Sequence, residues 1–411
     1  MWTASFRNYL ALITTTGISA VMAGIALSFT ILALTESPAL LSINLGLYFL
    51  PTILSPISGS IVDRYSTRLT LVSSVVIRVF LLVAFALIAL ADGQNQIPLL
   101  LTISLLIGIV KLPHSPGLRK VLTASVNKTK MLESNGVVTS FTQTGTAMSL
   151  LASGFLIEAI GPAQTVLLAA GLFMLTNVFI WLAPNVRSDP SSAPIRRFDL
   201  SGYSLILRSR TLLVMTVTVI LVSLFSTPVE SQLPKLMIDW GFNARGFSQF
   251  LVAMSVGVIA SGLVINKFGN QLNQRLTITA AVALIALVFV GIAYGHGTLL
   301  AMLGYGLTFG FAQSIIESFV YAHLHATVEE SVQGRLFAAV TGLDSLSTSI
   351  GYLILGGVSS VVSGSIIFVA CAVIMLVVLL YWAVGQPIDH DKERLGLHAE
   401  GEKRSRGPEL Q

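Results

Sequence analysis

Apolar residues run in long, nearly unbroken stretches along this chain, and short polar segments separate them. Between turn residues there are twelve such stretches. Each is close to the roughly 20 residues that a helix needs to cross the hydrocarbon core of a bilayer, so each predicts a membrane span. The predicted spans are residues 9–34, 41–62, 69–91, 97–117, 134–158, 163–183, 211–230, 247–265, 276–295, 298–322, 336–360 and 364–384.

A long polar stretch divides the predicted spans into two groups of six. This stretch, residues 184–210, carries five arginines together with prolines and serines, a composition typical of a loop. We therefore expect an all-α integral membrane protein with twelve transmembrane helices in two pseudo-symmetric six-helix halves, residues 1–183 and 211–384. The segment 385–411 is charged and nearly free of apolar residues, so we expect a disordered tail.

The composition excludes an ordinary water-soluble enzyme. Hydrophobic residues make up 54% of the 411 residues, charged residues only 10%, and the mean hydropathy is +0.82. A soluble domain carries about 25% charged residues. The net charge of +5 fits the basic loops of a membrane protein better than nucleic-acid binding. Cys371 is the single cysteine, so no internal disulfide forms.

The basic residues between the predicted spans are distributed unevenly between the two sides of the membrane. With the N terminus inside, only Lys235 and Arg245 lie on the outer side. Because basic loops stay on the cytoplasmic side, this asymmetry predicts that both termini and the central loop are cytoplasmic. The residues assigned to the cytoplasmic side are Arg7, Arg64, Arg68, Arg119, Lys120, Lys128, Lys130, Lys267, Arg275, Arg335, the five arginines of the central loop and five basic residues of the tail.

A short sequence pattern recurs after the second predicted span of each half. Gly59–Ser66 and Gly262–Gly269 both show a glycine, three residues, Asp or Asn, a basic residue, one residue and a small residue. Two similar six-span halves joined by a basic loop are typical of secondary transporters, in which binding sites form between the repeats near mid-membrane.

The first copy of the pattern resembles the signature loop of the major facilitator superfamily, G-x-x-x-D-R-x-G-R-R. Ser66 replaces the second glycine of that loop, and Thr67 replaces a base. The resemblance implies a gating loop, a latch that stabilises the outward-facing state and breaks when the halves rock. The alternative is that its charges only fix the orientation in the membrane. The matching residues are Gly59, Asp63, Arg64 and Arg68.

Two further segments resemble the bacterial macrolide-efflux and siderophore-exporter branch of this superfamily. They are Leu34–Pro38 after the first span and Gly334–Phe337 at the start of the eleventh. The resemblance covers nearly the whole chain in its span layout and implies a carrier that works by alternating access. Drug/proton antiporters of the superfamily usually carry a Gly-Pro pair inside the fifth span, whereas this chain has Ser149–Leu151 there.

Four acidic or basic residues remain in the interior of the predicted spans once the loops and span ends are assigned: Arg78, Lys111, Glu317 and Asp344. A charged side chain at the centre of a membrane helix costs about 2.5 to 3.5 kcal/mol on insertion scales, so such residues are functional by default. Glu317 and Asp344 are the candidates for proton coupling, because Asp344 shares a helix face with hydroxyl residues and Glu317 with Gln313. The alternative is a structural ion pair with Arg78 or Lys111.

The candidates for substrate binding are these two cations and a polar stripe. Arg78 lies too deep in its span to reach the membrane surface, and Lys111 precedes Pro113 and Pro116, which we expect to kink or open the helix. If Lys111 instead lies near the headgroups, its role is structural. The fifth predicted span adds uncharged polar residues that suit a pore lining or hydrogen bonds between helices. This stripe consists of Asn135, Thr139, Gln143 and Thr146, and its first three members are the candidates for substrate binding.

The sequence lacks a phosphate-binding G-x-x-x-x-G-K-[ST] loop, an H-E-x-x-H metal motif and a G-x-S-x-G nucleophile motif. We therefore expect a transporter that is not an enzyme and has no cofactor. Its energy would come from an ion gradient or from the gradient of the substrate itself.

These features predict a secondary active transporter of the cell (inner) membrane. We expect it to export a small amphipathic or anionic, siderophore-like metabolite, or a drug, by proton antiport with alternating access. The expected partners are the substrate, protons and the lipid bilayer, with no nucleic acid, and we expect a monomer. The alternatives are a proton-linked uptake permease, a lipid flippase and a carrier-shaped receptor.

Overall fold

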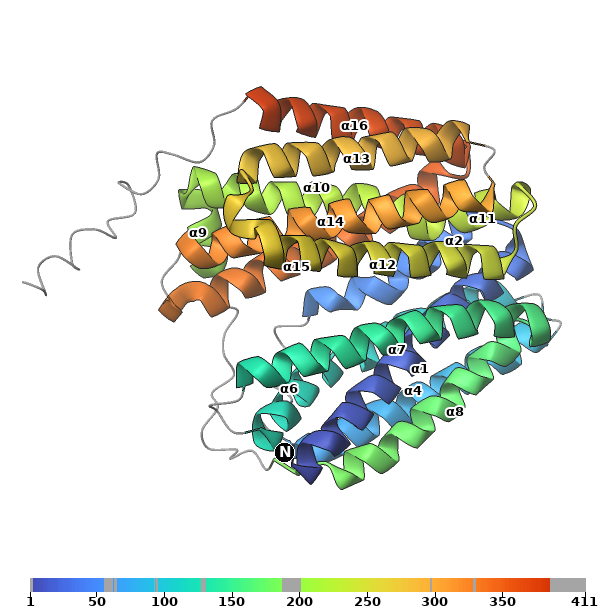
Figure 1. Cartoon of the computed structure of the whole chain (residues 1–411). Coiled ribbons are helices and arrows are strands. Elements are labelled where there is room, and N and C mark those ends of the chain that lie inside the picture. The colour runs from blue at the N-terminus through green and yellow to red at the C-terminus, as the bar shows by residue number, and fades with distance from the viewer. Residues whose placement is uncertain are drawn as a thin grey trace, which may run out of the picture.

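The computed structural model describes residues 3–54, 62, 65–91, 93, 95–126, 131–186, 201–295, 298–327 and 330–384. All regular elements in this part of the chain are helices, as the sequence predicts. Figure 1 shows two groups of helices, one mostly blue to green and one mostly yellow-green to red, with the blue helix α2 (Pro38–Phe49) between them against α15 (Glu330–Val358). The N terminus and the last turn of α16 (Gly364–Val384) lie at the same end of the bundle in this view.

The first half contains the first six predicted spans, and two of them are interrupted. The second span is an α-helix followed by a short 3-10 helix, and the fourth is divided in two by a turn at residues 111–113. The elements of this half are α1 (Ala4–Thr35), α2 (Pro38–Phe49), η1 (Leu50–Leu54), α4 (Thr67–Leu90), α5 (Gln96–Val110), α6 (His114–Ser125), α7 (Met131–Ile160) and α8 (Pro162–Leu182).

The second half begins with a helix that the sequence did not predict. This helix, α9 (Ser201–Arg208), belongs to the expected central loop and packs on α15 and α10. The seventh span is longer than predicted, because a second short helix continues it. The remaining elements are α10 (Arg210–Ser231), α11 (Leu233–Asp239), α12 (Ala244–Phe268), η3 (Gly269–Gln271), α13 (Gln274–Tyr294), α14 (Leu299–Thr327), α15 (Glu330–Val358) and α16. The expected tail, 385–411, lies outside the described residues.

Polar and turn-forming residues set where several of these helices begin. The side chain of Asn243 accepts a hydrogen bond from the backbone N–H of Gly246 at 3.1 Å and so caps the first turn of α12. Between α7 and α8, Gly161 adopts a φ of 92°, which favours glycine, and Pro162 then starts α8. Short connections of this kind keep successive spans antiparallel.

The helices have the length and surface of membrane spans. Within the described residues, nine helical segments are long and apolar enough to cross a bilayer. The other three predicted spans correspond to α2 with η1, to α7 and to α15. Large apolar side chains such as Phe80 and Leu300 are exposed on the surface, 71% and 79% respectively, which is favourable in lipid and unfavourable in water.

Hydrogen bonds join the two halves in the part of the bundle remote from the N terminus. The side-chain amide of Gln232 donates to the hydroxyl of Ser42 at 2.8 Å. Nearby, the amide of Asn243 donates to the carboxylate of Glu158 at 2.7 Å, so that α12 is tied to α7. Each bond links one half to the other.

Close packing of α2 on α15 adds to this contact. The hydroxyl of Ser349 donates to the backbone carbonyl of Gly46 at 3.0 Å, and the rings of Phe49 and Tyr352 stack with centres 5.8 Å apart. A Cβ atom at Gly46 would lie 2.8 Å from a methyl group of Leu353, so a larger residue there would separate the helices.

Equivalent arginines bind the end of the last helix in each half. At the start of α4, Arg68 donates to the carbonyls of Trp181 and Ala183 at 3.1 and 2.9 Å. At the start of α13, Arg275 donates to the carbonyl of Trp382 at 2.9 Å and to that of the next residue. Both cations satisfy carbonyl groups that lack partners within their own helix. The third and sixth spans are therefore joined in the same way in both halves.

Candidate functional site

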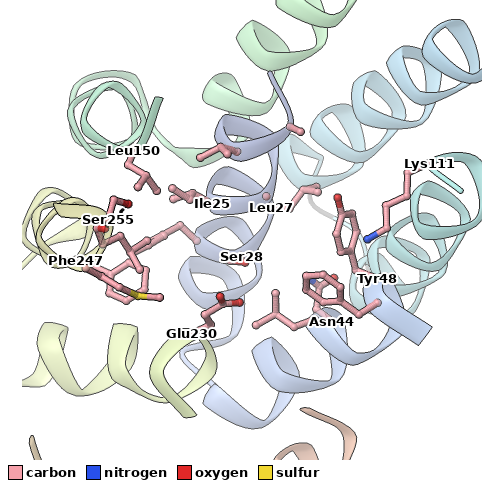
Figure 2. Close-up of a pocket in the computed structure, with 18 residues that line it drawn as sticks. Ile25, Leu27, Ser28, Asn44, Tyr48, Lys111, Leu150, Glu230, Phe247 and Ser255 are labelled. Carbon is pink, nitrogen blue, oxygen red and sulfur yellow. Dashed lines mark hydrogen bonds between the residues drawn. The ribbon is translucent and has the colours of Figure 1, made fainter. Parts of the chain in front are cut away.

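A cavity of about 400 Å³ lies between the two halves (Figure 2). The first half contributes residues from α1, α2, α7 and the turn between α5 and α6, and the second half contributes residues from α10 and α12. Most of the lining is apolar and polar groups are few, which is the usual composition of a small-molecule site. The polar and charged side chains in the lining are Ser28, Asn44, Tyr48, Lys111, Glu230 and Ser255.

Lys111 reaches the cavity wall because the fourth span is broken. Pro113 has no N–H to donate, and residues 111–113 form a turn between α5 and α6, which confirms the interruption expected from the sequence. The Nζ atom of Lys111 lies 3.6 Å from the ring centre of Tyr48 and 4.4 Å from that of Phe49. The negative ring faces stabilise the ammonium group but cannot replace a hydrogen-bonded anion.

Glu230 lies on the wall formed by the second half, and the sequence analysis missed it. It was assigned to the end of the seventh span, predicted as 211–230. In the structure the helical path continues through α11 to Asp239, so Glu230 lies well inside the bundle. Pro228 within α10 and Pro234 at the start of α11 mark a bent but continuous span, and this was the available signal. The carboxylate accepts a 2.6 Å hydrogen bond from Tyr352.

A second cavity of about 210 Å³ lies within the second half and shares Glu230 with the central cavity. Both proton-coupling candidates, Glu317 and Asp344, line it. The side-chain amide of Gln313 donates to Glu317 at 3.1 Å, whereas Oδ1 of Asp344 is buried without a described hydrogen-bond partner. Three carboxyl groups from different spans therefore surround one small polar space.

The alternative ion pairs are not formed in this conformation. Among the described residues, Lys235 and Asp239 form an ion pair on the surface at 2.7 Å, but neither Arg78 nor Lys111 pairs with Glu317 or Asp344. Among these groups inside the bundle the charges are segregated, with the cations Arg78 and Lys111 in the first half and the acids Glu317 and Asp344 in the second.

Arg78 lies behind the cavity wall. Its side chain is 5% exposed, its guanidinium group stacks on the ring of Phe173 at 4.9 Å, and its Nε and Nη2 atoms have no described hydrogen-bond partner. His114 is equally buried, and both of its ring nitrogens also lack described partners. Arg78 is close enough to Lys111 and His114 to interact with them electrostatically. The three form a basic cluster next to the central cavity.

The polar stripe of the fifth span is not part of the described cavity lining. Only Leu150 of α7 reaches the central cavity. Thr139 is exposed and Gln143 is half-buried, and neither lines it. The backbone of Asn135 belongs to α7, but its side chain lies outside the described residues.

A family comparison agrees with this architecture. A profile described as Major Facilitator Superfamily matches residues 9–328, which is most of both halves. The chain belongs to the major facilitator superfamily. It is therefore a multi-pass membrane transporter of small molecules, a secondary carrier that works by alternating access. A search of curated proteins finds no match to this chain.

Solved structures of other transporters share the fold of this superfamily member at low sequence identity. The nucleoside transporter NupG superposes with a TM-score of 0.74 at 10% identity over 92% of this chain and 98% of that one. A bacterial homologue of the iron transporter ferroportin, in an inward-facing state, superposes with a TM-score of 0.72 at 14% sequence identity. The match covers 92% of this chain and 98% of that one. An inward-facing, unoccupied bacterial homologue of the human lysosomal transporter Spinster superposes with a TM-score of 0.71 at 13% sequence identity. The match covers 92% of this chain and 97% of that one. At these identities the likeness shows the fold alone.

The signature loop of the superfamily lies mostly outside the described residues. This applies to three of the four expected gating residues, Gly59, Asp63 and Arg64. The fourth, Arg68, is described: besides its bonds to the end of α8, it stacks on the ring of Trp181 at 5.0 Å.

Proposed function

We propose that this superfamily member exports a small amphipathic compound with an anionic group, a siderophore-like metabolite or a drug, in exchange for protons. One observation carries the proposal, namely that Lys111 lies on the wall of an otherwise mostly apolar cavity between the halves. An ammonium group in such a cavity attracts a carboxylate, while the apolar walls bind the rest of the molecule. Arg78 and His114 lie behind it, and the charge of Arg78 adds to the positive potential.

We propose that Glu317 and Asp344 take up the coupling proton. Their cavity meets the central cavity at Glu230, so a change in the protonation of either acid acts next to the substrate. The hydroxyl and amide groups that line this cavity beside the carboxyl groups can hydrogen-bond to an acid in both of its protonation states. Proton release toward the cytoplasm and substrate release outside then share one conformational cycle.

We assign this conformation to the inward-facing state. The described hydrogen bonds between the halves, such as Gln232 to Ser42 and Asn243 to Glu158, lie at the end that the basic residues assign to the outer surface. Contacts that close the outer end leave the cytoplasmic end to open. In this proposal the loop with Asp63 and Arg64 forms its contacts when the cytoplasmic end closes.

Comparison of cells with and without the carrier tests the direction and the substrate together. A deletion strain is complemented with wild type, with Lys111→Gln or with the control Asp239→Asn, which removes a surface charge. Medium and cytosol are compared by untargeted mass spectrometry, with and without iron. We expect an anionic amphipathic compound to be retained inside the deletion and Lys111→Gln cells. Depletion of a solute inside those cells would instead establish an uptake permease.

A second measurement tests the coupling ion. In membrane vesicles that contain the wild-type carrier, addition of the retained compound should move protons in the opposite direction, as read by a pH-sensitive dye. Transport that is unaffected by collapse of the proton gradient would contradict proton antiport.

A further inference from the structure

Opposite charges face the central cavity from opposite halves. Lys111 comes from the first half and Glu230 from the second, and Figure 2 shows both among the side chains around the same space. Among the described residues they form no ion pair with each other or with any other group. Two unpaired opposite charges in one ligand cavity indicate a ligand that brings a counter-charge for each of them.

Each of the two groups retains bonding capacity toward the cavity. The described contacts of the Lys111 ammonium group are two ring faces, which leave its three N–H donors without a described acceptor. Glu230 accepts one hydrogen bond, from Tyr352 to Oε2, whereas a carboxylate has about four acceptor sites. In the described part of the chain, Lys111 therefore has free hydrogen-bond donors on one wall of the cavity, and Glu230 has free acceptor sites on the other.

We propose that the substrate is a zwitterion, with an anionic group bound by Lys111, a cationic group bound by Glu230 and an apolar body between them. The inference rests on the proposed role of this cavity as the substrate site, and it adds the cationic group to that proposal. Most of the other side chains that line the cavity are apolar, among them Ile25, Leu27 and Leu251. The volume of about 400 Å³ suits a small organic molecule.

This arrangement selects against substrates with a single kind of charge. A purely anionic ligand that reaches both walls faces the carboxylate of Glu230, and a purely cationic ligand faces Lys111. Repulsion in a cavity of low polarity rejects each of them more strongly than it would in water. A zwitterion also links the two halves electrostatically, so its binding favours conformations in which both walls contact it.

The test uses three probes with the same rigid body. These are 4-(4-aminomethylphenyl)benzoic acid, which is zwitterionic, biphenyl-4-carboxylic acid, which is anionic, and 4-phenylbenzylamine, which is cationic. Binding to the purified full-length carrier in detergent is measured by isothermal titration calorimetry. We expect the zwitterion to bind at least about ten-fold more tightly than either singly charged probe. This factor corresponds to a difference of about 1.4 kcal/mol in binding free energy.

Two variants locate the two charges. We expect Lys111→Gln to lower the affinity for the zwitterion and the anion about ten-fold without weakening the binding of the cation. We expect Glu230→Gln to lower the affinity for the zwitterion and the cation without weakening the binding of the anion. Lys235→Gln and Asp239→Asn make the same charge changes at the surface ion pair and should change none of the affinities. Size-exclusion profiles and melting curves show whether each variant is folded.

The outcomes separate this inference from the proposed function. Equal affinity for the anion and the zwitterion in the wild type overturns the zwitterion inference and leaves the proposed carrier of anionic compounds. A cation that binds most tightly overturns both. Binding of none of the three probes also counts against both, because it contradicts the assignment of the cavity as a site for charged amphipathic compounds.

Discussion

The hydroxyl of Tyr352 donates a hydrogen bond of 2.6 Å to the carboxylate of Glu230 and so joins the seventh and eleventh spans where the two cavities meet. Glu230 lines both cavities, whereas Tyr352 lines only the one that contains Glu317 and Asp344. This bond is a direct connection between the proposed proton site and the proposed substrate site.

Removal of the Tyr352 hydroxyl should lower the stability of the second half. Tyr352→Phe keeps the ring that stacks on Phe49 but leaves Glu230 without its described donor. Because hydrogen bonds to charged groups contribute about 1.5–3 kcal/mol, we expect the free energy of unfolding to fall by about that amount. Chemical denaturation in detergent measures it. Tyr294→Phe, at an exposed tyrosine, is the control, and an unchanged stability of Tyr352→Phe would show that the bond contributes nothing.

Neutral replacements of the two acids should uncouple transport. Glu317→Gln and Asp344→Asn keep the shape of each side chain but cannot take up a proton. We expect proton-driven transport to fall at least about ten-fold, while exchange of labelled for unlabelled substrate stays within about two-fold, because alternating access itself remains. Both rates are measured in proteoliposomes. If Glu317→Gln and Asp344→Asn both retain proton-driven accumulation, the coupling proton binds elsewhere.

Arg78 should cost stability and support function. Its guanidinium group is 5% exposed and has two nitrogens without described partners, so Arg78→Met removes a buried charge without leaving a partner unpaired. We expect the variant to be as stable as the wild type or more stable by about 1–3 kcal/mol. We also expect weaker binding of anionic substrates, because the positive potential behind Lys111 is reduced. A loss of stability as large as that of Arg68→Met would mean that Arg78 has a structural partner.

The paired arginines at the helix ends should contribute equally and independently. Arg68→Met and Arg275→Met each remove hydrogen bonds from a cation to terminal carbonyls, so we expect each to lower the free energy of unfolding by about 1–3 kcal/mol. The two sites lie in different halves, and the double variant should show the sum within about 0.5 kcal/mol. Denaturation of the four proteins measures this, and a marked deviation from the sum would show that the halves are coupled through these ends.

A larger residue at the contact between α7 and α12 should prevent closure there. A Cβ atom at Gly154 would lie 2.5 Å from Oγ of Ser248 and 3.0 Å from Cα of Arg245. We expect Gly154→Val to slow transport at least about ten-fold by favouring conformations with separated outer ends. Gly171→Val is the control, since nothing lies within 4 Å of a Cβ atom at Gly171.

Accessibility reports the conformational shift directly. A cysteine introduced at Ser255, in the cavity lining, with Cys371 replaced by alanine, is labelled with a membrane-impermeant maleimide on intact cells. Gly154→Val should raise the labelling, and Gly171→Val should leave it unchanged. Equal labelling in both would show that the contact at Gly154 does not control access.

The sequence predicted the membrane architecture well because long apolar stretches leave few alternatives to spanning helices. It also predicted the break beside Lys111, since Pro113 removes a backbone donor wherever the span lies. The depth of a side chain in the membrane and the side of its helix that faces the cavity were harder to predict from the sequence. Arg78 was expected to contact substrate, yet it points behind the wall, because which side of a helix meets a cavity depends on packing between spans that the sequence does not show.

Glu230 was missed as a site residue because the sequence does not show where its span ends. An acid at the predicted end of a span is naturally assigned to the membrane surface, and only the continuation of α10 into α11 places it inside. The three carboxyl groups around the second cavity could also not be grouped from the sequence. Residues far apart in the sequence meet there through tertiary packing, which no local pattern encodes.

The matched contacts of Arg68 and Arg275 also constrain how this carrier can move. In each half the start of the third span is fastened to the end of the sixth, so a half that bends would break charge-assisted hydrogen bonds at that end. The two halves should therefore behave as rigid bodies, and the shape change during a transport cycle falls on the surfaces where they slide past each other. Substitutions on those surfaces, such as those beside Gly46 and Gly154, should alter the speed of the cycle without altering how tightly each half holds together.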